Sequence, residues 1–208
     1  MRDHATLLGH GKRVAATGSR QDAPKHRGPA VFLDRDGTLN PDFRYLKDAL
    51  RLELFRGVTL GIRLLNEHGF RVLCVTNQSG IARGFYTADD VELIHRRINA
   101  RLSAGGARVD AFYFCPHLPN SGCSCRKPGT GLFQQAAQEW NIELSASAVI
   151  GDRLYDIQAG DQLGLLTALV LRAGRLDEFV GRSNRYGLKP DIRSNHFLGA
   201  VRAVLERG

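Results

Sequence analysis

The sequence predicts an α/β fold: a doubly wound, Rossmann-like parallel sheet with helices on both faces. Short apolar runs alternate with amphipathic stretches along the 208 residues, which is typical of parallel strands joined by covering helices. Polar residues follow several apolar runs directly, as expected at the carboxyl edge of such a sheet, where these folds bind ligands. Hydrophobic residues make up 43% and charged residues 24%, a globular composition.

The first 28 residues differ from the rest of the chain. They carry six Lys or Arg against two Asp, a charge of +4 that is half of the net +8, and show neither helical nor strand periodicity. We therefore expect a mobile basic leader at 1–28 and a single globular domain at 29–208. The leader has no apolar core of a secretory signal, and no apolar run approaches the ~20 residues of a membrane helix. We expect a cytoplasmic protein without a membrane partner.

The elements follow in order from local patterns. Five apolar runs suit covered strands and lie at 29–33, 70–75, 111–115, 147–151 and 167–172. Five stretches with helical spacing or caps are expected helices, at 57–69, 87–102, 131–140, 155–164 and 195–206. Thr87 and Asp90 form a predicted capping box, and Asn195 is the predicted cap of the last helix. Residues 173–194 are polar and predict a surface loop. No large insertion interrupts the pattern, so we expect only a minimal cap over the site.

Polar side chains follow the strands of the predicted sheet. Asp34 and Asp36 follow the first run, Thr76 the second and Asp152 the fourth. Because the carboxyl ends of parallel strands share one edge, Asp34, Thr76 and Asp152 should converge. One Asp alone would be interpreted as a turn or cap residue, but gathered carboxylates repel each other and require a hard cation such as Mg²⁺.

This site predicts phosphoryl chemistry. Lys127, just before a predicted helix, and the Thr76 hydroxyl would cradle a phosphoryl group. Asp34 could attack phosphorus and form an aspartyl phosphate, and Asp36 could give a proton to the leaving oxygen and then take one from water. Gly37 permits the sharp turn that follows.

Three of the four cysteines crowd into one segment. CPHLPNSGCSC (115–125) has the pattern C-x-H-x5-C-x-C, and its ligands Cys115, His117, Cys123 and Cys125 would complete a closed, structural zinc site. The alternative is a set of ordinary thiols. A zinc ribbon with a basic leader could also bind nucleic acid, but no basic residue lies between the ligands, so this non-enzymatic alternative is disfavoured.

The motifs resemble those of the haloacid dehalogenase superfamily of phosphohydrolases. FLDRDGTLN (32–40), VTNQSG (75–80), RKP (126–128) and VIGDRLYD (149–156) match its four motifs in order. The resemblance implies a nucleophile at Asp34, an acid/base at Asp36 and phosphoryl contacts from Thr76 and Lys127. It also implies Mg²⁺ on Asp34, Asp152 and the backbone carbonyl of Asp36.

Within the superfamily the chain is similar to two related branches. TNQSGIARGFYT (76–87) and NPDFRYLKD (40–48) resemble the D-glycero-D-manno-heptose 1,7-bisphosphate 7-phosphatases, whereas the short cysteine loop and GDRLYDIQ (151–158) also resemble histidinol-phosphate phosphatases. The favoured interpretation is the heptose branch, acting in nucleotide-activated heptose and lipopolysaccharide biosynthesis on a phosphorylated sugar, as a monomer. The implied substrate contacts, besides Thr76 and Lys127, are Asp42, Phe43, Arg44, Tyr45, Asn77, Gln78, Ser79, Arg126 and Arg153. A planar guanidinium suits a second phosphate, which favours Arg126 for that role.

Overall fold

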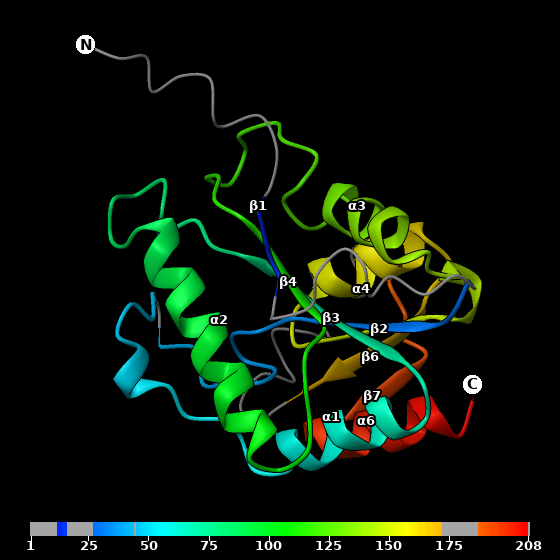
Figure 1. The fold of residues 1–208 in the computed structure, drawn as a ribbon. Coiled ribbons are helices and arrows are strands. Elements are labelled where there is room, and N and C mark those ends of the chain that lie inside the picture. Colours follow the sequence, from blue (N-terminus) through cyan, green and yellow to red (C-terminus); the bar gives the residue numbers. More distant parts are fainter. Residues whose placement is uncertain (1–11, 16–26, 44, 172–186, 208) are drawn as a thin grey trace.

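The computed structural model describes residues 12–15, 27–43, 45–171 and 187–207, and for 12–15 only the backbone. These residues form a seven-stranded sheet in the order β1-β4-β3-β2-β5-β6-β7 (Figure 1). Its strands are β1 (Lys12–Ala15), β2 (Ala30–Leu33), β3 (Arg71–Asn77), β4 (Ala111–Cys115), β5 (Ala148–Gly151), β6 (Leu166–Val170) and β7 (Ile192–Ser194). Strands β2 to β7 pair in parallel, and β1 adds to β4 in the antiparallel direction. The predicted doubly wound parallel sheet is confirmed.

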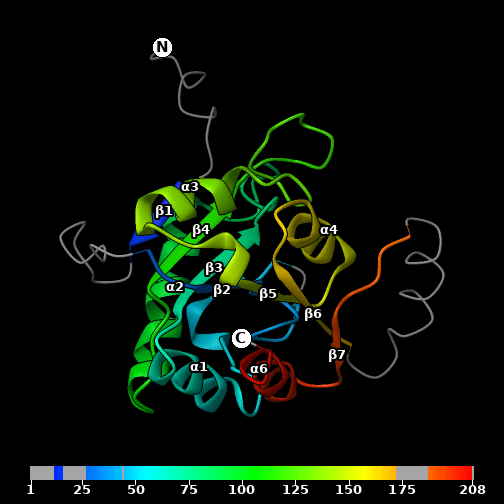
Figure 2. The same cartoon turned by 90° about the vertical axis from the view of Figure 1, so that its right-hand side faces the viewer.

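Helices cover both faces of this sheet (Figure 2). The α-helices are α1 (Val58–Glu67), α2 (Ala88–Ser103), α3 (Gly131–Trp140), α4 (Leu154–Gln162) and α6 (Phe197–Leu205), and two 3-10 turns lie at Ala49–Arg51 and Leu144–Ala146. Buried residues of α1, α2 and α6 pack on one face, and those of α3 and α4 on the other. Strands β2 to β6 are therefore covered on both sides, which explains why they are continuous apolar runs.

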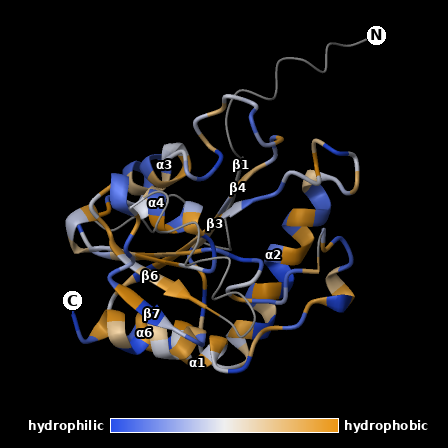
Figure 3. Cartoon of the chain, turned by 180° about the vertical axis from the view of Figure 1, so that it is seen from behind, coloured by the Kyte–Doolittle hydropathy of each residue, from blue (hydrophilic) through white to orange (hydrophobic). Residues whose placement is uncertain are grey.

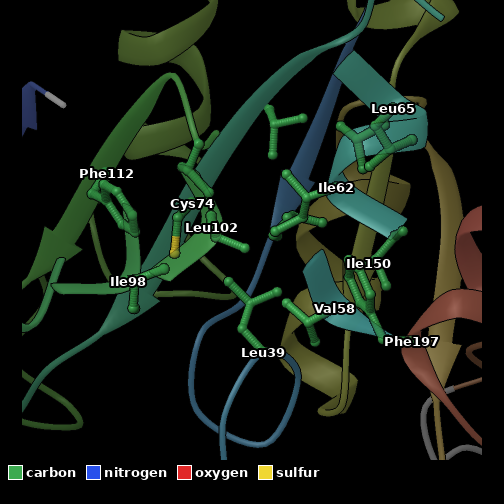
Figure 4. Packing of buried hydrophobic residues seen from close by; sticks show 14 of the residues in the cluster. Leu39, Val58, Ile62, Leu65, Cys74, Ile98, Leu102, Phe112, Ile150 and Phe197 are labelled. Carbon is green, nitrogen blue, oxygen red and sulfur yellow. The ribbon is translucent and has the colours of Figure 1, made fainter. Parts of the chain in front are cut away.

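The central strand β2 shows how the two cores arise. Val31 and Leu33 point into one apolar cluster, whereas Phe32 points into the other, because successive side chains alternate across a strand. Figure 3 shows the resulting apolar colouring of β6 inside the layers of helices. Figure 4 shows side chains from separate helices gathered over the first face, among them Ile62, Ile98 and Phe197.

The order of the strands decides where a site can form. Leu33 at the end of β2 pairs with Cys74 of β3 on one side and with Ile150 of β5 on the other. The chain thus winds away from β2 in both directions and leaves a crevice beyond the carboxyl end of β2, where ligands bind in open α/β sheets. Asp34 is the first residue past that end.

Three local predictions need correction. Strand β1 lies inside the predicted leader, and β7 lies inside the stretch expected to be a surface loop. The cap of α6 is His196, whose Nδ1 accepts from Gly199 N at 2.8 Å, so the prediction of Asn195 is wrong. The capping box of Thr87 and Asp90 at α2 is confirmed. The division into 1–28 and 29–208 stays a prediction.

None of the described helices has the length and apolar character to span a bilayer.

Candidate functional site

The turn after β2 brings the first motif into place. Asp34 N donates to Ile150 O at 3.0 Å, and the amides of residues 38–40 point back to Arg35 O. Gly37 lies in this turn with φ 90°, and a Cβ on it would collide with the Asp152 carboxylate. Glycine is therefore required both by the left-handed backbone and by the close approach of the turn to Asp152, the first residue past β5.

Three buried carboxylates meet beyond this edge. Oxygens of Asp34, Asp152 and Asp156 lie within 4.8 Å of one another, although Asp34 follows β2 and the other two follow β5. The predicted convergence of Asp34 with Asp152 is therefore confirmed, and the oxygen donors fit a hard divalent cation. Asp156 was not among the predicted site residues. The signal that could have found it is its spacing of four from Asp152, which puts it on the first turn of α4.

Lys127 is the buried cation of this cluster. Its Nζ lies 2.8 Å from Asp34 Oδ1 and 2.6 Å from Asp156 Oδ1, and donates to Val75 O at 2.6 Å. Burial alone would lower the pKa of Lys127, but Asp156 and Asp34 outweigh it and hold that pKa above its usual value. On Asp156 burial has the opposite effect and raises the pKa of the carboxyl, although Lys127 opposes this shift.

Asn77 holds the loop that carries this lysine. Its Nδ2 donates to Lys127 O at 3.2 Å, and its Oδ1 accepts from Lys127 N at 3.0 Å. This pair of bonds joins the end of β3 to the third motif. Asn77 was predicted as a substrate contact, and the structure shows its amide engaged with the Lys127 backbone.

Asp36 points to a different set of partners. Its carboxylate accepts from Arg35 Nε at 3.1 Å and Nη2 at 2.7 Å, from Asn40 Nδ2 at 2.9 Å and from Gln78 Nε2 at 2.8 Å. Burial would raise the pKa of Asp36, but the charge and hydrogen bonds of Arg35, with those of Asn40 and Gln78, lower it overall. Asp36 is thus an ionised carboxylate in the absence of substrate.

A polar pocket of ≈ 370 Å³ opens above these groups. Ten predicted site residues line it, namely Asp34, Asp36, Asp42, Tyr45, Thr76, Asn77, Gln78, Ser79, Arg126 and Arg153. Tyr86 and Tyr155 also line it and were not predicted. Phe43 is 39% exposed and does not belong to the lining, and Arg44 lies outside the described residues.

The rim of the pocket carries two arginines. Arg153 Nη2 lies 2.8 Å from Asp42 Oδ2 and its Nε 3.3 Å from Asp152 Oδ2, so it joins two loops across the mouth. Arg126 Nη1 donates to His117 O at 3.2 Å. On another side, Tyr45 packs edge-on against Phe85 with ring centroids 4.6 Å apart. This arrangement of a carboxylate floor, a lysine and basic rim groups suits an anionic sugar phosphate.

The predicted zinc ligands also come together. Ligand atoms of Cys115, His117, Cys123 and Cys125 lie within 4.8 Å of one another. Cys115 Sγ is 3.2 Å from Cys125 Sγ and 3.7 Å from Cys123 Sγ, and His117 Nδ1 is 3.1 Å from Cys125 Sγ. A tetrahedral zinc with Zn–S bonds of about 2.3 Å requires such mutual distances, so three thiols and one imidazole fit the ion.

Comparisons with known proteins agree with this geometry. Residues 124–187 match the family model described as HAD-hydrolase-like. A D-glycero-beta-D-manno-heptose-1,7-bisphosphate 7-phosphatase of Yersinia pestis is 39% identical over 71% of this chain and 82% of its own length. The Rhodopseudomonas palustris enzyme of the same name is 40% identical over 67% and 81%. Among solved structures, the D,D-heptose 1,7-bisphosphate phosphatase of B. bronchiseptica, complexed with magnesium and phosphate, superimposes with a TM-score of 0.77 at 30% identity, covering 86% of this chain and 99% of that one.

Proposed function

Since the chain belongs to the D-glycero-beta-D-manno-heptose-1,7-bisphosphate 7-phosphatase family of HAD-like hydrolases, we propose that it removes the 7-phosphate of D-glycero-D-manno-heptose 1,7-bisphosphate. It is a phosphoric monoester hydrolase, and this substrate places it in nucleotide-activated heptose biosynthesis. The observation that carries the proposal is the convergence of Asp34, Asp152 and Asp156 beside a polar pocket, with Lys127 paired to Asp34 and Asp156. The curated relatives above carry the beta anomer in their names, so we propose that anomer as the preferred one.

The chain's own residues can carry out both halves of the hydrolysis. A carboxylate oxygen of Asp34 attacks phosphorus, the bond from phosphorus to the sugar oxygen breaks, and protonated Asp36 gives its proton to that oxygen. Asp36 then takes a proton from water, whose oxygen attacks phosphorus and releases Asp34 and inorganic phosphate. The phosphate dianion bound nearby raises the pKa of Asp36 by like-charge repulsion, which allows a group that is ionised in the free enzyme to hold the proton.

The remaining groups bind and orient the phosphoryl group. Lys127, held between Asp34 and Asp156, presents a positive charge to it, and the buried residue Thr76 lines the pocket. Magnesium on Asp34, Asp152 and the Asp36 carbonyl would neutralise the charge of the phosphoryl oxygens. Asp156 keeps Lys127 in position and caps α4 by accepting from Arg153 N at 3.1 Å.

We assign the second phosphate of the substrate to the rim. Arg126 and Arg153 line the pocket on loops that follow different strands, and a guanidinium can hold a phosphate through two parallel N–H bonds. Arg153 would exchange its bond to Asp42 for this contact. Zinc on the cysteine cluster would fix the loop that carries Arg126 and Lys127, so its role is structural.

A substrate panel tests the proposal. With Mg²⁺ fixed, kcat/KM is measured for both anomers of heptose 1,7-bisphosphate and for histidinol phosphate. The beta anomer should be hydrolysed fastest and only at its 7-phosphate, as followed by ³¹P spectroscopy. Equal or faster turnover of histidinol phosphate would refute the heptose assignment.

Asp34→Asn tests the covalent mechanism. It removes the nucleophile and should abolish phosphate release while zinc content and the circular dichroism spectrum stay those of the wild type. Surviving activity would show that phosphorus is not attacked by Asp34.

A further inference from the structure

Arg35, between the two catalytic aspartates, is an unusual buried charge. Its side chain is the largest among the fully buried ones of the described residues, at 0% exposure. Two of its nitrogens, Nε and Nη2, form a fork on the Asp36 carboxylate. The third, Nη1, lies 3.3 Å from His95 Nε2. A guanidinium buried so completely requires a partner on each side, and its fork geometry transmits any rotation to the carboxylate it holds.

His95 is the partner on the far side. It lies on α2, is 1% exposed, and stacks on Phe112 of β4 with ring centroids 4.4 Å apart and planes 13° apart. Because a guanidinium can only donate, His95 Nε2 must accept, and the ring is therefore neutral with its hydrogen on Nδ1. Burial and the adjacent Arg35 both lower the pKa of His95, which agrees with this neutral form. No hydrogen-bond partner for Nδ1 occurs in the part of the chain that the structure describes.

The other contacts of Asp36 come from elements that do not involve α2. Asn40 Nδ2 donates to Oδ1 and Gln78 Nε2 to Oδ2, and Gln78 Oε1 in turn accepts from Tyr86 OH at 2.6 Å. The carboxylate is thus oriented from the turn after β2, from the end of β3 and from α2 through Arg35. On the α2 side, His95 itself neither lines the pocket nor contacts the Asp36 carboxylate. The effect of His95 on the chemistry can therefore be separated from that of the substrate contacts.

We propose that His95, acting through Arg35, is a positioning residue that aims the Asp36 carboxylate at the leaving oxygen. Stacking on Phe112 fixes the plane of the His95 imidazole, and the imidazole fixes the position of Arg35 Nη1. The Nε and Nη2 atoms of Arg35 then fix the orientation of the Asp36 carboxylate. Without an acceptor at Nε2, the guanidinium rotates to find another partner and carries Asp36 with it. This inference rests on the proposed acid/base role of Asp36.

The leaving group provides the readout. A sugar alkoxide is a poor leaving group and needs a proton from Asp36 as the phosphorus–oxygen bond breaks, whereas the phenolate of an aryl phosphate leaves without one. A misdirected Asp36 should therefore slow phosphorylation of Asp34 by heptose bisphosphate and not by p-nitrophenyl phosphate. A purely structural role for His95 would affect both substrates equally.

The experiment compares three substitutions at position 95 by single-turnover rapid-quench kinetics, normalised to folded protein by circular dichroism. His95→Phe keeps a ring on Phe112 but has no acceptor. His95→Gln places an amide oxygen near the position of Nε2, and His95→Asn carries the same amide one methylene short of it. We expect His95→Phe and His95→Asn to slow phosphorylation by heptose bisphosphate by about 10- to 100-fold, with p-nitrophenyl phosphate within about 3-fold of wild type. His95→Gln should restore most of the loss.

Asp36→Asn serves as the reference that separates the two claims. If Asp36→Asn loses the sugar reaction selectively and the His95 variants do not, the positioning role is refuted while the proposed function stands. If Asp36→Asn shows no selectivity between the two substrates, the acid role itself is wrong. If His95→Phe does not fold, the comparison of His95→Asn with His95→Gln decides, and equal rates for that pair would overturn the inference.

Discussion

Replacing Lys127 by Met tests how much the charge of this buried lysine contributes to stability. Met has similar length and volume but no charge, so the change leaves Asp34 and Asp156 buried without their shared counter-charge. Both carboxylates are at most 4% exposed and lie within 2.8 Å of the lysine nitrogen, so water cannot take over its role.

The size of the expected loss in stability follows from this burial. Breaking a buried ion pair by removing one partner costs about 3–5 kcal/mol, because the remaining charge is uncompensated. The ion pairs of Asp34 and Asp156 share one lysine, so their energies are not independent and this cost is not doubled. Against a typical stability of about 5–15 kcal/mol, the loss is a large share of the total. Mg²⁺ should recover part of it, since the cation attracts the same carboxylates.

Urea unfolding measures this loss directly. Trp140, the only tryptophan in the chain, is buried and donates to Tyr113 OH at 3.0 Å, so its fluorescence should report the transition. We expect the free energy of unfolding to fall by about 3–5 kcal/mol without Mg²⁺, and by less with it. Adding Asp156→Asn to the variant should restore some stability, because it removes a carboxyl whose ionised form burial and Asp34 both disfavour. A Lys127→Met protein within about 1 kcal/mol of wild type in Mg²⁺-free buffer would refute the reasoning.

Three further predictions concern other parts of the molecule. Gly37→Ala should lose phosphatase activity, and its free energy of unfolding in urea should fall by at least about 1–2 kcal/mol, because the added Cβ strains the left-handed turn and collides with Asp152. Activity and unfolding free energy equal to those of the wild type would contradict this. Cys123→Ser should lose zinc, measured by atomic absorption, and retention of one equivalent would dismiss the structural-zinc claim. Asp90→Asn should destabilise α2 at neutral pH, because hydrogen bonds from Thr87 lower the folded-state pKa of Asp90. The contribution of the Asp90 carboxylate to stability is therefore present above pH ~4 and is lost as the pH falls through the lowered pKa. A loss of stability in the variant that persists in acid would exclude this cause.

Much of the fold could be predicted because its signals are local. Five strands were expected from apolar runs, and the helices from 3.6-residue spacing and caps such as Thr87 with Asp90. Strands β1 and β7 were missed because four and three residues at the edges of the sheet carry too little pattern to detect. The cap of α6 was misplaced by one residue, since Asn195 and His196 are both able to cap and only the backbone conformation at His196 decides between them.

The proposed catalytic aspartates and zinc ligands could be predicted from the amino-acid sequence itself, because residue type and short spacing determine which atoms can share an ion. Strand order then brought Asp34 and Asp152 together, as parallel topology requires. Only the tertiary structure showed that Asp156 shares Lys127 with Asp34, and that His95 contacts Arg35 across 60 residues of chain. Such pairs depend on how α2 and α4 pack against the sheet and on the rotamers that this packing allows, and no local pattern encodes either.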